Sequence, residues 1–143
     1  MRFLDLPPIW LFAVLVLVWL SPWTIAWGWP FWLGLILLAA AALLTLGAVR
    51  EFSRSRTTII PHLDPKALIT DGIFQYTRNP IYLADLLILL GLSLIWGKPL
   101  GLLLAPPFAW LLQKRFILGE EARLRAAFGD AFERYATGTR RWL

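Results

Sequence analysis

The sequence contains no cysteine and a single histidine among its 143 residues. Disulfides, thiolate nucleophiles and cysteine-ligated metals are therefore excluded, and one histidine cannot build a histidine-cluster zinc or di-iron site. Charged residues are also scarce, at 16% of the chain, whereas 59% of the residues are hydrophobic and the mean hydropathy is +0.65. A soluble domain of this size needs a more polar surface. We therefore expect an all-α integral membrane protein without a metal, folded as one domain over residues 1–143.

Basic residues outnumber acidic ones by 14 to 9, which gives a net charge of +5. A basic chain can bind nucleic acid, but these residues flank long apolar runs instead of forming a continuous basic face. We therefore expect no nucleic-acid partner. The expected partner is the lipid bilayer with its anionic headgroups, and the sequence carries no signal of the oligomeric state.

Long apolar runs predict about four transmembrane helices, over residues 8–27, 30–49, 80–96 and 99–117. The second run has about 20 residues and would be about 30 Å long as a helix, which is enough to cross the hydrocarbon core of a bilayer. Pro22 is expected to end the first helix early or to kink it. The third and fourth runs are separated only by Gly97, Lys98 and Pro99, so they are predicted to form a tight helical hairpin.

The distribution of lysine and arginine predicts the orientation of these helices. Lys98 lies in the hairpin turn, and the other 13 of the 14 basic residues lie before the first run, between the second and third, or towards the C-terminus. Cytoplasmic loops carry the excess of positive charge in multi-pass membrane proteins. We therefore expect both termini and the loop 50–79 in the cytoplasm, and the inner membrane of a prokaryote as the location.

The C-terminal segment 119–143 is predicted to be amphipathic and to pack on the headgroup side of the membrane. Its apolar side chains recur at helical spacing: Leu124, Phe128, Phe132 and Tyr135. Gly129 interrupts this pattern, and Asp130 with Glu133 resembles a capping box, so a new short helix is expected to start there. A surface amphipathic helix explains the pattern without any further function.

Two polar clusters lie at the same end of the predicted hairpin, QYTRNPIY before its first helix and KRFILGEEARL after its second. Because the two helices are antiparallel, these clusters are neighbours. We expect one site at the membrane interface that collects Arg78, Asn79, Tyr82, Lys114, Arg115, Glu120 and Glu121. Adjacent glutamates cannot face the same way on a helix, so one is expected to point inward. The alternative is a set of exposed ion pairs, which contribute only about 0 to 1 kcal/mol.

Three segments occur in a characteristic order: TTIIP, KALITDGIFQYTRNPIYLADLLILLGLSL and GEEARLRAAFGDAFERYATGTRR. Over roughly residues 30–141, they resemble the isoprenylcysteine carboxyl methyltransferase and phospholipid methyltransferase superfamily. The RNPxY motif together with the EExxL and FGxxFxxY motifs is far more specific for this superfamily than either part alone. The resemblance implies a membrane enzyme that binds S-adenosyl-L-methionine at the cytoplasmic face. It also implies a lipophilic substrate, a lipidic or prenylated acceptor that is methylated on a carboxylate or an amine.

The resemblance also implies roles for individual residues. The residues that would line the cofactor are Lys66, Ala67, Leu68, Ile69, Phe74, Asn79, Pro80 and Tyr82. Glu120 would hold the polar end of the cofactor with support from Glu121, and Arg78 or Arg115 would orient an acceptor carboxylate. Asn79 stands where the eukaryotic prenylcysteine enzymes have histidine. Asparagine cannot titrate near neutral pH, so no histidine-dependent proton step is expected there.

Two titratable residues lie outside the family motif. Asp85 is one turn into the third apolar run, and an ionisable residue inside a membrane is a functional candidate by default. Its shallow depth favours another explanation, an ion pair with a neighbouring arginine. His62 lies in a proline-flanked loop and is expected to face solvent or headgroups.

Two other functions are compatible with the same composition. A membrane reductase of the sterol-reductase type would bind a nicotinamide cofactor in place of S-adenosylmethionine. A small scaffold or transporter subunit would tolerate neutral substitutions at Arg78, Glu120 and Glu121, because it would have no catalytic site there.

Overall fold

Every regular element of the protein is a helix in a computed structural model that describes residues 6–26, 28–55 and 66–143. The elements in chain order are α1 (Pro7–Leu20), α2 (Trp29–Arg54), the 3₁₀ helix η2 (Gly72–Gln75), α3 (Pro80–Ile95), α4 (Pro99–Leu112), the π-helix η3 (Gln113–Ile117), α5 (Leu118–Phe128) and α6 (Asp130–Gly138). The all-α prediction is confirmed for this part of the chain. The TTIIP segment and His62 lie outside the described residues.

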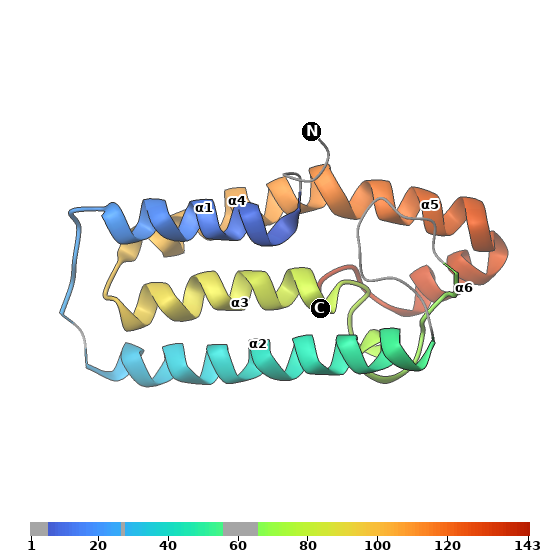
Figure 1. Ribbon diagram of the computed structural model, residues 1–143, viewed down its shortest axis with the longest axis horizontal. Coiled ribbons are helices and arrows are strands. Elements are labelled where there is room, and N and C mark those ends of the chain that lie inside the picture. The colour runs from blue at the N-terminus through green and yellow to red at the C-terminus, as the bar shows by residue number, and fades with distance from the viewer. Residues whose placement is uncertain (1–5, 27, 56–65) are drawn as a thin grey trace.

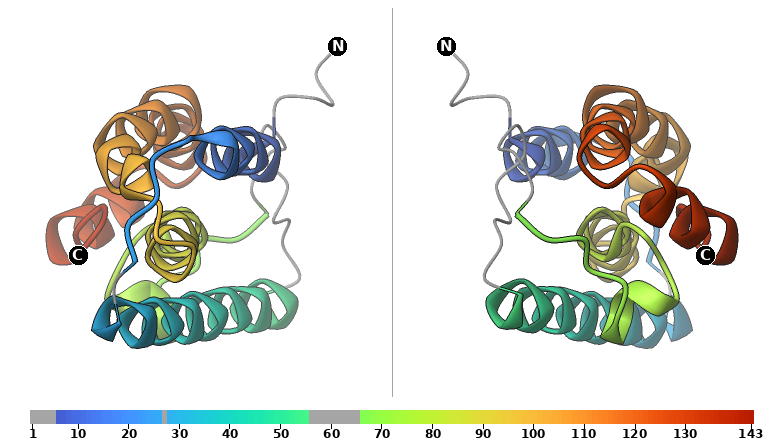
Figure 2. Two further views of the ribbon diagram at one scale, coloured as in Figure 1. Left: turned by 90° about the vertical axis from the view of Figure 1, so that its left-hand side faces the viewer. Right: turned by 90° about the vertical axis from the view of Figure 1, so that its right-hand side faces the viewer.

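Four helices run side by side, and α3 lies between α2 on one side and the pair of α1 and α4 on the other (Figures 1 and 2). The C-terminal end of α2, the N-terminal end of α3 and the C-terminal end of α4 lie at the same end of this bundle (Figure 1). From there α5 extends beyond the bundle, and α6 turns back towards it. The polar clusters on either side of the hairpin are thus placed at one end, as the sequence predicts.

Proline occupies the first or second position of each of the four long helices, where its missing N–H has no partner to lose. The predicted first span, residues 8–27, is too long, because α1 ends at Leu20. Ser21 has an extended backbone with φ −63° and ψ 137°. It precedes Pro22, whose ring disfavours the helical conformation of the residue before it.

The helix most suited to crossing a membrane is α2. Its segment Pro30–Arg54 has 25 residues, a mean hydropathy of 2.3, and only 17% of its most apolar window is buried within the protein. Most of its surface is therefore available to lipid. The helix continues beyond the predicted end at residue 49. Both α1 and α3 are apolar but shorter, with 14 and 16 residues.

The hairpin between α3 and α4 forms as predicted, through a turn at Gly97 with a positive φ of 66°. The Lys98 amide donates a hydrogen bond to the carbonyl of Ser93 (2.8 Å), and its ammonium donates one to the carbonyl of Ser21 (2.6 Å). The backbones of α2 and α3 lie close together at Gly34 and Gly91. A Cβ atom on Gly34 would lie 2.7 Å from the carbonyl oxygen of Gly91, and one on Gly91 would lie 2.9 Å from the carbonyl oxygen of Gly34.

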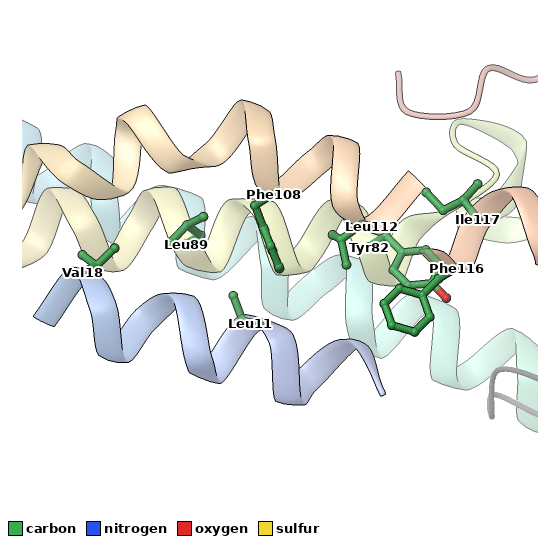
Figure 3. Close-up of a cluster of buried hydrophobic side chains, with 8 residues drawn as sticks. All are labelled: Leu11, Val18, Tyr82, Leu89, Phe108, Leu112, Phe116 and Ile117. Atoms are coloured by element: carbon green, nitrogen blue, oxygen red, sulfur yellow. The ribbon is translucent and has the colours of Figure 1, made fainter. Parts of the chain in front are cut away.

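A cluster of buried apolar side chains fills the space between α1, α3 and α4 (Figure 3). Towards the polar end of the bundle, the ring of Phe116 stacks on that of Tyr82, with 6.2 Å between centroids and 19° between planes. Phe116 and its neighbour Ile117 are both buried, and both belong to the π-helix η3. Single π-turns of this kind occur frequently at functional sites.

The predicted break in the C-terminal segment is confirmed at Gly129, which has a positive φ of 48° between α5 and α6. The predicted capping box is wrong. Gly129 is the N-cap residue of α6, Asp130 is already in the helix, and no side chain in the described part of the chain caps it. The carboxylate of Glu133 instead accepts a hydrogen bond from the guanidinium of Arg125 on α5.

Candidate active site

The phenol of Tyr82 joins the two halves of the hairpin. It lies in the first turn of α3 and donates a hydrogen bond of 2.5 Å to Oε1 of Glu120 on α5. Stacking on Phe116 fixes the plane of the tyrosine ring. The RNPxY and EExxL segments therefore meet, as the sequence predicts. The Glu120 carboxylate is held at the polar end of the helix bundle.

The second glutamate of the pair points the other way and is buried in an ion-pair network. Arg141 donates two hydrogen bonds to Glu121, of 2.8 Å to Oε1 and 2.7 Å to Oε2. Nη2 of Arg78 lies 3.5 Å from Oε1 of the same carboxylate. Glu121 is thus the central anion between two arginines, and it orients Arg78 at the edge of the site.

Residues 140–142 form hydrogen bonds to the residues around the site, which the sequence did not predict. The side-chain amide of Asn79 donates a hydrogen bond of 2.9 Å to the carbonyl of Arg141. The backbone amide of Arg78 donates one of 3.0 Å to the carbonyl of Arg140. Trp142 donates from Nε1 to Oε1 of Gln113 in η3 (3.1 Å). The only signal in the sequence was the polar, arginine-rich composition of a segment expected to lie on the surface.

The segment before α3, which contains η2, packs against α2 and α6. The rings of Phe52 and Phe74 meet edge to face, 5.5 Å apart at 90°. The phenol of Tyr135 on α6 donates a hydrogen bond of 2.7 Å to the carbonyl of Phe74. The 3₁₀ helix η2 is therefore held against both helices, which places Phe74 beside the site.

A small pocket of about 60 Å³ lies between these elements. Its walls are formed by Phe52, Phe74, Arg78, Asn79, Pro80, Ile81, Tyr82 and Glu120. Six of these eight residues were predicted from the sequence. The other two were not: Phe52 lies on α2, and Ile81 is the variable position of the RNPxY motif. In the wall of the pocket, Nε of Arg78 is buried and has no hydrogen-bond partner among the described residues.

Several predicted site residues lie outside the pocket walls. Lys66, Ala67, Leu68 and Ile69 do not line the pocket, and Ile69 packs on Phe74 in a separate apolar cluster. Arg115 lies on the opposite side of η3, with its guanidinium 5.1 Å from the centre of the Trp10 ring on α1. Lys114 is exposed. In the structure, Arg78, Asn79 and Tyr82 thus lie near Glu120 and Glu121. The two basic residues of η3 do not lie in this group.

Asp85 is buried in α3, with only 7% of its surface exposed. Within the part of the chain that the structure describes, its Oδ2 atom has no hydrogen-bond partner and the side chain forms no ion pair. The arginine partner expected from the sequence is therefore absent from these residues.

The environment of Glu121 predicts how stability depends on pH. Burial favours its neutral form, but the hydrogen bonds from Arg141 and the charge of Arg78 outweigh burial and hold the pKa of Glu121 below its usual value of 4.5. A depressed pKa in the folded state contributes stability above pH 4.5 that is lost as the pH falls towards the folded value. We expect the difference in thermal midpoint between the wild type and Glu121→Gln to shrink below pH 4.5. Tryptophan fluorescence in detergent measures it, and a difference that is constant from pH 7 to pH 3.5 would contradict this assignment.

Comparison with known proteins relates the chain to one family. A family model described as phospholipid methyltransferase matches residues 29–131. The chain is 37% identical over 68 residues to the protein-S-isoprenylcysteine O-methyltransferase of Schizosaccharomyces pombe. The aligned region covers 48% of this chain and 29% of the length of that protein. No solved structure matches the chain significantly.

Proposed function

Because the chain belongs to the phospholipid methyltransferase family, we propose that it transfers a methyl group from S-adenosylmethionine to a lipidic acceptor at the cytoplasmic face of a membrane. The observation that supports this most directly is the pocket where Tyr82 and Glu120 meet beside Nε of Arg78, which has no hydrogen-bond partner in the described ranges. The match over residues 29–131 favours a methyltransferase over a nicotinamide-dependent reductase or a scaffold subunit.

The proposed membrane arrangement has four spans, with α1 to α4 crossing the bilayer and α5 and α6 at its cytoplasmic surface. Lys98 is then the one basic residue on the far side among the described residues, in agreement with the positive-inside rule. The short helices α1 and α3 require local thinning of the bilayer or burial of their ends against neighbouring elements. In this arrangement the pocket lies where cytoplasm and bilayer meet, so a soluble cofactor and a lipid can reach the same site.

The pocket residues fit the polar part of S-adenosylmethionine. The amino-acid end of this molecule carries one carboxylate and one ammonium, and its ribose carries two hydroxyls. The buried Nε of Arg78 offers a donor to the carboxylate, and Glu120 offers acceptor oxygens to an ammonium or to hydroxyls. Charge-assisted hydrogen bonds of these kinds are about twice as strong as neutral ones. Phe52 and Phe74 provide apolar walls for the remainder.

The chain's contribution to catalysis is alignment and exclusion of water. When bound, S-adenosylmethionine supplies a methyl group on a sulfonium, which is already a good leaving group. Tyr82 fixes the carboxylate of Glu120, and Glu121 fixes Arg78, so the polar groups of the pocket are oriented before a ligand binds. Preorganised positioning of this kind supplies a large part of the rate of bimolecular reactions.

Binding of S-adenosylmethionine to the full chain in nanodiscs, measured by calorimetry, tests the proposal. We expect the wild type to bind, and Glu120→Gln and Tyr82→Phe each to bind at least about tenfold more weakly, because each removes a hydrogen bond to a charged group. Glu133→Gln is the matched control. Its side chain is half exposed on α6 and pairs with Arg125 outside the pocket, so its affinity should equal that of the wild type. No binding by the wild type, or binding of a nicotinamide cofactor instead, would refute the proposal.

A further inference from the structure

Arg78 lies in an irregular segment between two helices. The 3₁₀ helix η2 ends at Gln75 and α3 begins at Pro80, so residues 76–79 belong to neither of them. The regular hydrogen bonds of a helix therefore do not fix Arg78, and the backbone polar groups of this segment need partners elsewhere. The place of Arg78 in the pocket wall depends on what the segment contacts.

The carbonyl of Arg141 holds the backbone on both sides of Arg78. It accepts a hydrogen bond of 2.9 Å from the side-chain amide of Asn79 and one of 3.3 Å from the hydroxyl of Thr77. The same hydroxyl accepts a bond of 3.2 Å from the backbone amide of Asn79. Thr77 and Asn79 are both buried, so water does not compete for these bonds. The residues before and after Arg78 are thus bound to a single carbonyl oxygen.

The guanidinium of Arg141 acts on the side chain of Arg78 through Glu121. Its two hydrogen bonds to Glu121, of 2.8 and 2.7 Å, form a bidentate pair. Such a pair fixes the orientation of a carboxylate as well as its distance. Because Nη2 of Arg78 lies 3.5 Å from Oε1 of that carboxylate, the direction of the Arg78 side chain depends on an anion that Arg141 orients.

We propose that Arg141 is a positioning residue that directs Nε of Arg78 into the pocket and thereby gives the site its preference for a ligand with a carboxylate. The pocket walls, as the described residues form them, do not include Arg141, so it acts through Arg78. This inference rests on the proposed function, in which Arg78 binds the carboxylate of S-adenosylmethionine. It concerns a residue beyond the segment 29–131 that the family model matches.

Loss of the Arg141 guanidinium has a specific consequence for the pocket. The Glu121 carboxylate loses two hydrogen bonds, and a buried anion in that state attracts the neighbouring cation more strongly. Arg78 is then drawn towards Glu121, and its Nε turns away from the pocket. The hydrogen bond from Tyr82 to Glu120 does not involve Arg141, so the part of the pocket that receives an ammonium or hydroxyls stays in place. Only recognition of the carboxylate should be lost.

The test compares S-adenosylmethionine with decarboxylated S-adenosylmethionine, which keeps the sulfonium, the ammonium and the ribose but lacks the carboxylate. Calorimetry measures both affinities for the full chain in nanodiscs. We expect the wild type to bind the ligand with the carboxylate at least about tenfold more tightly, since the bond to Arg78 joins two charged groups. Arg141→Ala should lose about tenfold in affinity for S-adenosylmethionine. Its affinity for the decarboxylated ligand should stay within about twofold of the wild type, which also shows that the pocket is folded.

Three further variants separate positioning from other effects. Arg141→Lys keeps the positive charge and the backbone carbonyl but not the bidentate geometry, so its loss for S-adenosylmethionine should be intermediate. Arg134→Ala removes an exposed arginine of α6 and should bind both ligands as the wild type does. When Arg78→Gln is already present, adding Arg141→Ala should cause no further loss, because the side chain that it positions is gone.

Equal losses for the two ligands in Arg141→Ala and Arg141→Lys would mean that Arg141 only stabilises the fold, and this would overturn the inference. Unchanged affinities in both variants would also overturn it, as would a wild type that binds the two ligands equally well. In each of these cases the proposed function stands. A wild type that binds neither ligand would overturn the proposed function itself.

Discussion

Replacing Glu121 with alanine is expected to be among the most damaging single changes near the site. It lowers the free energy of unfolding by about 2 to 4 kcal/mol, because it leaves two arginines near the interior without their shared anion. We place the value below that of a fully buried pair because the Arg141 side chain is 31% exposed. Affinity for S-adenosylmethionine should also fall, although Glu121 does not line the pocket, because Arg78 and the residues after Thr139 lose their anchor.

Thermal unfolding in detergent and calorimetric titration measure these two effects separately. The control is Glu133→Ala, which also removes a glutamate from an ion pair with arginine. That pair is about half exposed on both sides, so its loss should cost no more than about 1 kcal/mol. Equal losses for the two variants would mean that burial of the Glu121 network contributes nothing to stability.

The second large effect is expected at Gly91, where the backbones of α2 and α3 approach each other closely. A Cβ atom there would lie 2.9 Å from the Gly34 carbonyl oxygen and 3.1 Å from the side chain of Leu38. The contact with Gly34 is to backbone, which cannot rotate away. Gly91→Leu should therefore force the two helices apart and prevent accumulation of folded protein, since helices in membranes associate through close packing of small residues. Gly91→Ala should remain folded but lose about 1 to 3 kcal/mol, the usual range for overpacking.

Gly138→Ala provides the matched comparison at the end of α6. Among the residues that the structure describes, nothing lies within 4 Å of a Cβ atom at Gly138, so alanine is expected to be tolerated. Expression as a monodisperse species in detergent, followed by the thermal midpoint, ranks the three variants. Wild-type behaviour of Gly91→Leu would show that α2 and α3 are not packed as described.

The sequence predicted the apolar helices and the meeting of the two motifs because both follow from patterns that lie close together along the chain. Proline at the start of each helix and the short turn at Gly97 fix the hairpin, and the hairpin brings Tyr82 to Glu120. What could not be predicted depends on contacts between distant segments. The pairing of Arg141 with Glu121 joins residues 20 positions apart across a helix break at Gly129, and no local pattern specifies its geometry.

The π-helix η3 explains why the sequence pattern predicted the wrong positions for Lys114 and Arg115. A regular α-helix of 3.6 residues per turn would predict the directions of Lys114 and Arg115 from their spacing to Glu120. Within η3 the turn is wider, so side chains are rotated from those directions. Arg115 consequently meets Trp10 on α1, and the pocket keeps a single arginine in its wall.

The position of residues 139–142 bears on how the protein matures. These residues leave the ribosome after all four long helices, yet they provide the carbonyls and the guanidinium that hold Asn79, Arg78 and Glu121. During synthesis the helices can therefore insert and pair before the candidate site is complete. The order of the elements along the chain thus separates placement in the bilayer from assembly of the pocket, which has to wait for residues 139–142.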